Sequence, residues 1–162
     1  MYESPHRNIR NLTDGLQNTE RSVLDAMKTE IDVALILWNS DVIELVSFAL
    51  DQENLRSCGA EPSAGLAAIE QMIQYRNPSV VVFDLDPPYD RSAATLLRLL
   101  KRFPSRFFVV TCADKALAVK KAPWLSGHPM FQKPYGMDEV ADVVGSLVRR
   151  VPQSVAMSSA AL

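Results

Sequence analysis

Short, continuously apolar segments alternate with amphipathic segments through most of this chain, and that alternation limits the folds it can adopt. The apolar segments have the length and continuity of strands buried on both faces of a sheet. The expected strands are 33–38, 55–58, 80–83, 107–111 and 129–132. Apolar residues recur at helical spacing after each strand. The expected helices are 42–50, 66–73, 93–100, 113–122 and 138–148.

Five strand–helix units in succession favour one architecture. Parallel strands need crossover helices, and strands that are apolar on both sides need a helical layer on each face of the sheet. The sequence therefore predicts an α/β fold with a doubly wound, five-stranded parallel sheet, in the flavodoxin-like order 2-1-3-4-5. Ligands of such sheets bind at the carboxyl ends of strands 1 and 3.

The two ends of the chain differ from this central pattern. Residues 1–30 are mostly polar and are expected to form an N-terminal extension with a short helix that starts near Asn18. That helix could be a dimerising or partner-binding arm, a helix lying on its own domain, or a frayed terminus. The domain itself is expected at 31–151, with a flexible C-terminal tail at 152–162.

Composition excludes several classes of function. The net charge is -2, from 17 basic and 19 acidic residues, so no overall positive field favours nucleic acid or an anionic membrane. No apolar run approaches the roughly 18–20 residues of a membrane span, and the polar N-terminus does not resemble a secretory signal. These features predict a cytoplasmic protein. Arg98, Lys101, Arg102 and Arg106 are best interpreted as a solvated helix face.

The supply of catalytic side chains is small. Cys58 and Cys112 lie in apolar, strand-like surroundings and are expected to stay reduced. His6 and His128 are the only histidines, too few for most zinc sites or histidine-based triads. No nucleophile–base pair is evident, so the chain is not expected to be an enzyme.

Polar residues follow four of the expected strands. Asn39, Asp84, Thr111 and Lys133 each come directly after or at the end of an apolar run. Parallel topology gathers these positions at one edge of the sheet. A carboxylate, a hydroxyl and an ammonium placed together can bind an oxyanion, and Asp84 could act as nucleophile or metal ligand.

Each of these residues also has a purely structural interpretation. Asp84 could be an ion-pair partner of Lys133, and Thr111 could cap the helix that follows it. Asp86, which precedes Pro87, could be a turn former. Trp38 could be core or lid packing.

The order and spacing of these residues resemble the receiver domain of two-component response regulators, over residues 31–150. In that family a strand ends in the phosphoacceptor Asp, with a Pro four residues later, as Asp84 and Pro88 stand here. The family's strand-4 hydroxyl matches Thr111, and its Lys-Pro pair matches Lys133-Pro134. The resemblance implies a cis peptide bond before Pro134.

The sequence departs from the family pattern at two places. Receivers end strand 1 with two acidic residues that help to hold Mg²⁺, and Trp38 and Asn39 occupy these positions here. Asn39 and Asp86 could restore part of a weak metal site around Asp84, so Mg²⁺ is possible but doubtful. The aromatic switch residue of the family corresponds to Met130.

These departures favour a stand-alone, atypical receiver-like signalling module that acts through protein–protein interaction. The expected partner surface is the face of the fourth helix, fifth strand and fifth helix (Ala113 to Arg150), with Trp124 exposed near it, and it could also form a homodimer. One alternative is a conventional phosphoacceptor that receives phosphate from a histidine kinase or phosphotransfer protein. The other is a flavodoxin-like small-molecule-binding domain.

Overall fold

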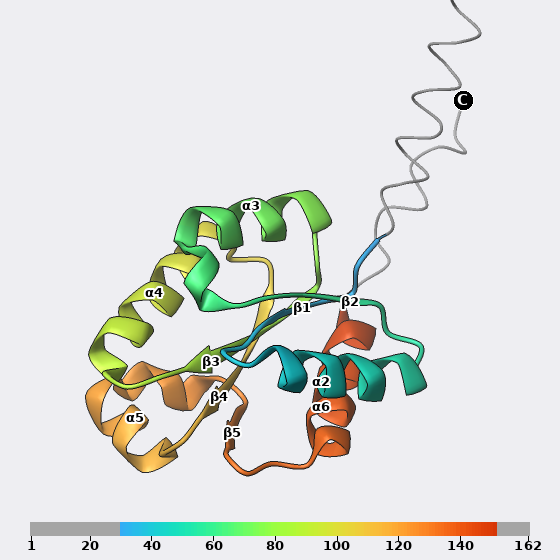
Figure 1. The fold of residues 1–162 in the computed structure, drawn as a ribbon. Coiled ribbons are helices and arrows are strands. Elements are labelled where there is room, and N and C mark those ends of the chain that lie inside the picture. The colour runs from blue at the N-terminus through green and yellow to red at the C-terminus, as the bar shows by residue number, and fades with distance from the viewer. Residues whose placement is uncertain (1–29, 152–162) are drawn as a thin grey trace, which may run out of the picture. The chain divides into compact units, whose positions relative to one another are not determined.

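The sheet has the predicted architecture. The computed structural model describes residues 30–151, and the expectations for 1–29 and 152–162 lie outside this part of the chain. Five strands pair in parallel in the order β2-β1-β3-β4-β5 (Figure 1). Their bounds are β1 Val33–Ile36, β2 Ser57–Ala60, β3 Val80–Leu85, β4 Phe107–Cys112 and β5 Met130–Gln132.

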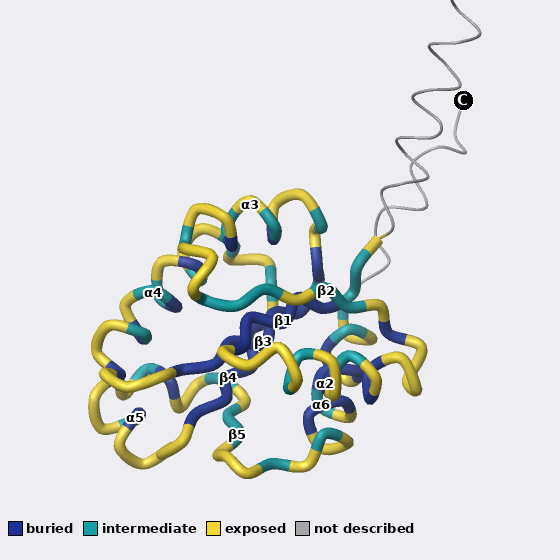
Figure 2. The backbone as a smooth tube through the Cα atoms, in the orientation of Figure 1, coloured by how far each residue is buried: buried dark blue, intermediate teal, exposed yellow. Residues whose placement is uncertain are grey.

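Helices cover both faces of the sheet. The α-helices are α2 Ser40–Gln52, α3 Leu66–Arg76, α4 Tyr89–Arg102, α5 Lys115–Lys121 and α6 Met137–Arg150, with short 3-10 helices η1 Pro62–Ala64 and η2 Pro123–Gly127. One core cluster joins α3, α4 and α5 to the sheet, and a second joins α2 and α6 to its other face. Between these layers every residue of β1 and β3 is buried (Figure 2).

The second strand was the least accurate prediction. It was expected at 55–58, whereas β2 begins two residues later, at Ser57, and pairs through Ala60 with Ile36. The Leu55 N–H donates to the Leu50 carbonyl, which ties this residue to the end of α2 instead of to the sheet. A buried Leu55 therefore reflects packing in the turn after α2, which an apolar pattern does not distinguish from a strand.

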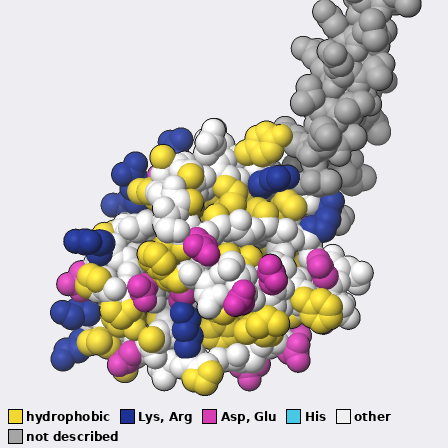
Figure 3. All heavy atoms as spheres, in the orientation of Figure 1, with side chains coloured by type: hydrophobic (Ala, Val, Ile, Leu, Met, Phe, Trp, Pro, Cys, Tyr) yellow, Lys and Arg dark blue, Asp and Glu magenta, His cyan; other side chains and the backbone are white. Residues whose placement is uncertain are grey.

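The two helical layers differ in charge. Helices α3, α4 and α5 contain eight Lys or Arg and two Asp or Glu, whereas α2 and α6 contain six Asp or Glu and two Arg. Lys and Arg gather along the side formed by α4 and α5 in Figure 3. The charge separation follows directly from the sequence of each helix.

Two further predictions concern membranes and thiols. No helix among residues 30–151 is long and apolar enough to cross a membrane. Cys58 in β2 is half-buried and Cys112 in β4 is buried, and both are free thiols. Burial raises the pKa of both thiols, and the nearby Asp84 carboxylate adds to the effect at Cys112.

Candidate functional site

Strand register brings three of the expected residues together. Asp84 of β3 lies directly opposite Thr111 of β4 in the parallel ladder. Cys112 pairs with Gln132 of β5, and the Lys133 N–H donates to the Cys112 carbonyl at 2.8 Å. The carboxyl ends of β3, β4 and β5 therefore place these side chains at one edge of the sheet, as the sequence predicted.

The Asp84 carboxylate is buried and both of its oxygens are occupied. Thr111 Oγ1 donates to Oδ1 at 3.0 Å, and Lys133 Nζ donates to Oδ2 at 2.6 Å. Asp84 is 3% exposed and Thr111 is fully buried, whereas the Lys133 side chain is 40% exposed. We call Asp84, Thr111 and Lys133 the strand-end cluster. The ion-pair interpretation of Asp84 agrees with this geometry.

Thr111 does not cap the following helix, so that interpretation was wrong. Asp114 is the N-cap of α5, and its side chain accepts the Leu117 N–H at 2.9 Å. The Thr111 side chain instead points to Asp84, because it stands within β4 at a ladder position opposite that carboxylate. The hydroxyl is thus part of the strand-end cluster.

Asn39 serves the helix that follows β1. Its Oδ1 accepts the Asp41 N–H at 2.8 Å, and its backbone is extended, as is usual for an N-cap residue. Asn39 is therefore the N-cap residue of α2. The amide oxygen that could have faced the strand-end cluster is engaged by the first turn of α2.

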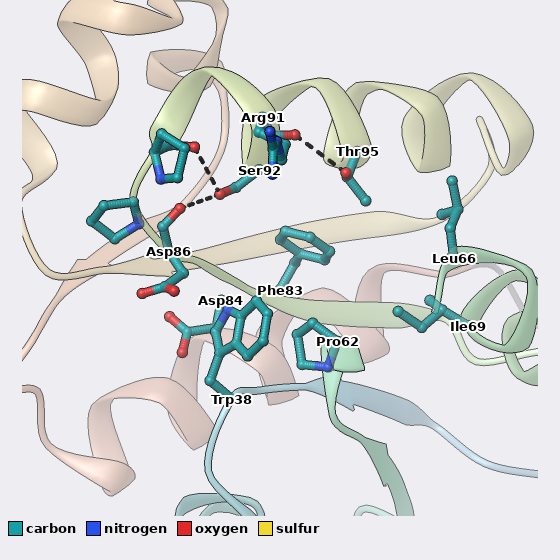
Figure 4. A pocket seen from close by; sticks show the side chains of 12 residues that line it. Trp38, Pro62, Leu66, Ile69, Phe83, Asp84, Asp86, Arg91, Ser92 and Thr95 are labelled. Carbon is teal, nitrogen blue, oxygen red and sulfur yellow. Dashed lines mark hydrogen bonds between the residues drawn. The ribbon is translucent and has the colours of Figure 1, made fainter. Parts of the chain in front are cut away.

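Trp38 stands at the edge of a hollow beside the strand-end cluster. The indole is 45% exposed, so Trp38 is not core packing. It lines a cavity of about 320 Å³ together with Pro62, Leu66 and the carboxylates of Asp84 and Asp86 (Figure 4). The cavity lies at the ends of β1 and β3, where the strand order reverses direction.

Asp86 lies in the turn between β3 and α4, and its backbone and side chain differ in their contacts. Its backbone carbonyl accepts the Ser92 hydroxyl, which fixes the turn into α4. Its exposed carboxylate has no hydrogen bond or ion pair within residues 30–151. The peptide bonds before Pro88 and Pro134 are both cis, and the second of these was predicted from the family resemblance.

Tyr135 is the site residue that sequence reasoning missed. Burial raises the pKa of the Tyr135 phenol, the Asp84 carboxylate raises it further, and the Thr111 hydroxyl opposes both effects. The Tyr135 ring also packs against Phe131, with centroids 6.2 Å apart. Its position two residues after Lys133 was the available signal, but only the turn through Pro134 brings the phenol back to Thr111.

Met130 and Trp124 lie away from the strand-end cluster. Met130 begins β5 and packs partly buried against the core cluster of α3, α4 and α5. Trp124 was expected to be exposed, but it is half-buried against the same core and meets His128 edge-on, with ring centroids 6.1 Å apart. The 3-10 helix η2 turns it inward. Leu117 of α5, at 42% exposed, is the exposed large apolar side chain on this face.

Comparison with solved structures identifies the fold. The apo receiver domain of nitrogen regulatory protein C is 18% identical to the chain, with a TM-score of 0.61 over 75% of this chain and 97% of its own. HP1043, an orphan response regulator of H. pylori, is 16% identical, with a TM-score of 0.58 over 74% of this chain and 97% of its own.

A third structure is an atypical orphan response regulator, described as revealing a phosphorylation-independent regulatory mechanism. It is 17% identical, with a TM-score of 0.58 over 74% of this chain and 97% of its own. No protein-family model matches the chain, and no curated protein sequence does. At these identities the likeness concerns the fold. The chain has the fold of a response regulator receiver domain.

Proposed function

We propose that this chain is an atypical receiver-like signalling module that acts through protein–protein contact without depending on Mg²⁺-assisted phosphorylation of Asp84. One observation carries the proposal: both Asp84 oxygens are bound within the protein, while the end of β1 supplies an indole and an amide already used as a helix cap. The two free thiols suit a reducing compartment, which supports a cytoplasmic location.

The residues at this edge do not fit a magnesium site. Mg²⁺ requires near-octahedral oxygen ligands and is usually held by one or two carboxylates together with phosphate oxygens and waters. Lys133 and Thr111 hold the Asp84 carboxylate, and the Asn39 oxygen accepts a backbone N–H. Of the two carboxylates that line the cavity, Asp86 is the one without a hydrogen-bond or ion-pair partner among residues 30–151. No group of three or more His, Cys, Asp or Glu suited to a metal occurs there.

A phosphoryl group on Asp84 would also face an unfavourable charge balance. It would carry about -1.5 to -2 charges at neutral pH. Asp86 lines the same cavity as Asp84, and Lys133 is the cation in contact with Asp84. Lys133 and the exposed Arg91, which also lines the cavity, would together balance only part of this negative charge, so the phosphorylated state would be destabilised without a divalent cation.

The proposed partner surface is the face of α5, β5 and α6. Lys133 and Tyr135 connect this face to Asp84, because both side chains follow β5 and precede α6. Leu117 supplies exposed apolar area on α5, and Lys120 and Lys121 flank it at the end of the helix. A partner protein or a second copy of the chain would bind at this face. Leu117→Glu should weaken such an association, whereas Leu45→Glu on the opposite layer should not.

A conventional phosphoacceptor is the second candidate, since one specific observation favours it. Thr111 and Lys133 both contact Asp84, and the three residues stand at the positions that receivers use for phosphate. In that case a histidine kinase or a phosphotransfer protein would be the partner. The two candidates differ in whether the crevice can hold Mg²⁺.

Restoring the missing acids separates the two candidates. Two-dimensional NMR would follow the Asp84 and Thr111 amides during titration with Mg²⁺, alone and with beryllofluoride. We expect no saturable change in the natural chain at millimolar Mg²⁺, and saturable binding once Trp38→Asp and Asn39→Asp are combined. Trp38→Asn is the matched control, because it removes the indole without adding charge. A beryllofluoride adduct on Asp84 of the natural chain would overturn the proposal in favour of the phosphoacceptor.

A further inference from the structure

The cavity beside Asp84 combines an exposed aromatic ring with a carboxylate that has no partner. We propose that it binds a small planar organic cation, of the aromatic amidinium type, between the Trp38 indole and the Asp86 carboxylate. The volume of about 320 Å³ lies at the lower end of the range of small-molecule sites, which suits a ligand of one or two rings.

The apolar wall of this cavity favours a flat ligand. It consists of Trp38, Pro62, Leu66, Ile69 and Phe83. The indole is almost half exposed although it stands among apolar side chains, so its ring surface is available to a ligand. Tryptophan is also the aromatic side chain that attracts cations most strongly, and the attraction grows when water is excluded.

The polar end of the cavity offers acceptors of hydrogen bonds. Asp84 and Asp86 both line it, and Figure 4 draws their carboxylates close to the Trp38 ring. The hydrogen-bonding capacity of Asp84 is engaged by Thr111 and Lys133, but Asp86 is free of ion pairs among residues 30–151. A ligand that brings N–H donors and positive charge would satisfy Asp86 and relieve repulsion between the two carboxylates.

The hydroxyl groups of α4 support the same ligand chemistry. Ser92 donates its proton to the Asp86 carbonyl, and Thr95 donates its proton to the Arg91 carbonyl at 3.2 Å. Ser92 and Thr95 both line the cavity, and because their hydroxyl protons are committed to backbone carbonyls these residues offer no donor to a ligand. The charged donor that an anion would find here is the exposed Arg91, whereas an amidinium would find the Asp86 carboxylate, which is unpaired among residues 30–151.

Arg91 is the one cation among the residues that line this cavity. It is exposed on the first turn of α4, as Asp86 is in the turn before that helix, so water screens both charges. Lys133 neutralises Asp84 but does not line the cavity, which leaves Asp86 to set the charge preference at the Trp38 end. Arg91 should therefore weaken cation binding modestly, and its removal should strengthen it.

Binding at this position goes beyond the proposed signalling role and does not require it. If both hold, the ligand would supply the input that phosphorylation supplies in other receivers, because it would lie against the residues around Asp84. The magnesium titration tests the signalling proposal, and ligand binding is measured separately, so failure of either can be told from failure of the other.

Three probes of one size test the ligand class. Benzamidine is a planar cation, benzamide is its neutral analogue and benzoate is its anionic analogue. The full chain carrying Trp124→Phe would report binding through Trp38 fluorescence, and NMR of the natural chain would map the shifts. We expect saturable benzamidine binding at least about tenfold tighter than benzamide binding, a difference of about 1.4 kcal/mol, and no saturable benzoate binding.

Charge variants then locate the site. Asp86→Asn should weaken benzamidine binding about tenfold, and Arg91→Gln should strengthen it severalfold. Asp90→Asn is the matched control, because Asp90 is an exposed carboxylate of α4 that faces Lys121 outside the cavity. Equal or tighter binding of benzoate, no saturable benzamidine binding, or equal effects of Asp86→Asn and Asp90→Asn would each overturn the proposal.

Discussion

The strand-end cluster and the cavity beside Trp38 form one crevice at the carboxyl ends of the strands. Its two sides differ in burial and in hydrogen bonding. On the side of β3, β4 and β5, the buried Asp84 and Thr111 and the partly exposed Lys133 form a polar cluster in which each group has a partner. On the side of β1, Trp38 is half-exposed over a cavity and Asn39 turns away to cap α2. The first side carries the residues that resemble the receiver pattern, and the β1 side carries an indole and an amide where that pattern has two acids.

The difference shows that strand register fixes one side of the crevice and leaves the other side free to vary. Parallel register keeps Asp84, Thr111 and Lys133 together as long as the sheet forms. Nothing in the sheet requires an acid after β1, where the chain leaves β1 and caps a helix within three residues. The two sides can therefore diverge independently, and variants on each side should have separable effects.

The largest effect is expected from Lys133→Met. Asp84 would remain buried with its charge uncompensated, at a cost of about 2–3 kcal/mol in the free energy of unfolding, measured by urea denaturation. Lys120→Met, at an exposed position on α5, is the control and should be nearly neutral. Adding Asp84→Asn to Lys133→Met should recover part of the loss. If the losses in unfolding free energy from Lys133→Met and Asp84→Asn simply added in the double variant, the ion pair would not be the source of the Lys133→Met loss.

Thr111→Val should have the next largest effect. The substitution keeps the shape of a fully buried side chain and removes the hydrogen bond to Asp84 Oδ1, so we expect a loss of about 1–2 kcal/mol. Thr95→Val removes a hydroxyl that bonds the Arg91 carbonyl on the surface of α4 and should change stability by less than about 0.5 kcal/mol. Equal losses in the two variants would contradict a special role for the strand-end cluster.

On the β1 side, Asn39→Ala should cost about 1 kcal/mol because α2 loses its N-cap. Asn39→Asp should keep the cap and place a favourable negative charge at the start of the helix, so stability should stay level or rise slightly. Thermal unfolding followed by circular dichroism would measure both. If Asn39→Asp were as damaging as Asn39→Ala, the role of Asn39 would be something other than capping.

The smallest effect concerns Tyr135 at alkaline pH. Its pKa is raised in the folded chain above the ordinary value of 10.0, so the unfolded state loses this proton first as the pH rises. The contribution to stability is fully present below about pH 10 and is lost above it. Tyr135→Phe should flatten the alkaline fall in the unfolding midpoint, whereas Tyr75→Phe, at an exposed position, should not. If the unfolding midpoint fell with the same slope at alkaline pH in both variants, Asp84 would have no influence on the Tyr135 phenol.

The strand-end cluster could be predicted from the sequence because the carboxyl ends of parallel strands lie at the same edge of the sheet. Once Asp84, Thr111 and Lys133 are assigned to strand ends, the topology brings them together whatever the loops do. Asn39 was also predictable as a cap, because capping depends on the few residues next to it.

The remaining parts of the site depend on how the chain turns. Tyr135 reaches Thr111 only through the path that the backbone takes after Lys133, and Trp124 is turned inward by η2. The start of β2 was misplaced because Leu55 is buried by the turn after α2 and not by the sheet. Apolar periodicity predicts that a residue is buried, but it does not predict which neighbouring helix, strand or turn covers it.

The charge separation between the two helical layers has a consequence for association. A body with a basic α3–α5 side and an acidic α2–α6 side behaves as an electric dipole even when its net charge is small. Such a dipole turns toward a charged partner during the encounter, before any surface touches. The orientation of approach is thereby decided by long-range forces, and added salt should slow productive collisions more than it loosens the complex once formed.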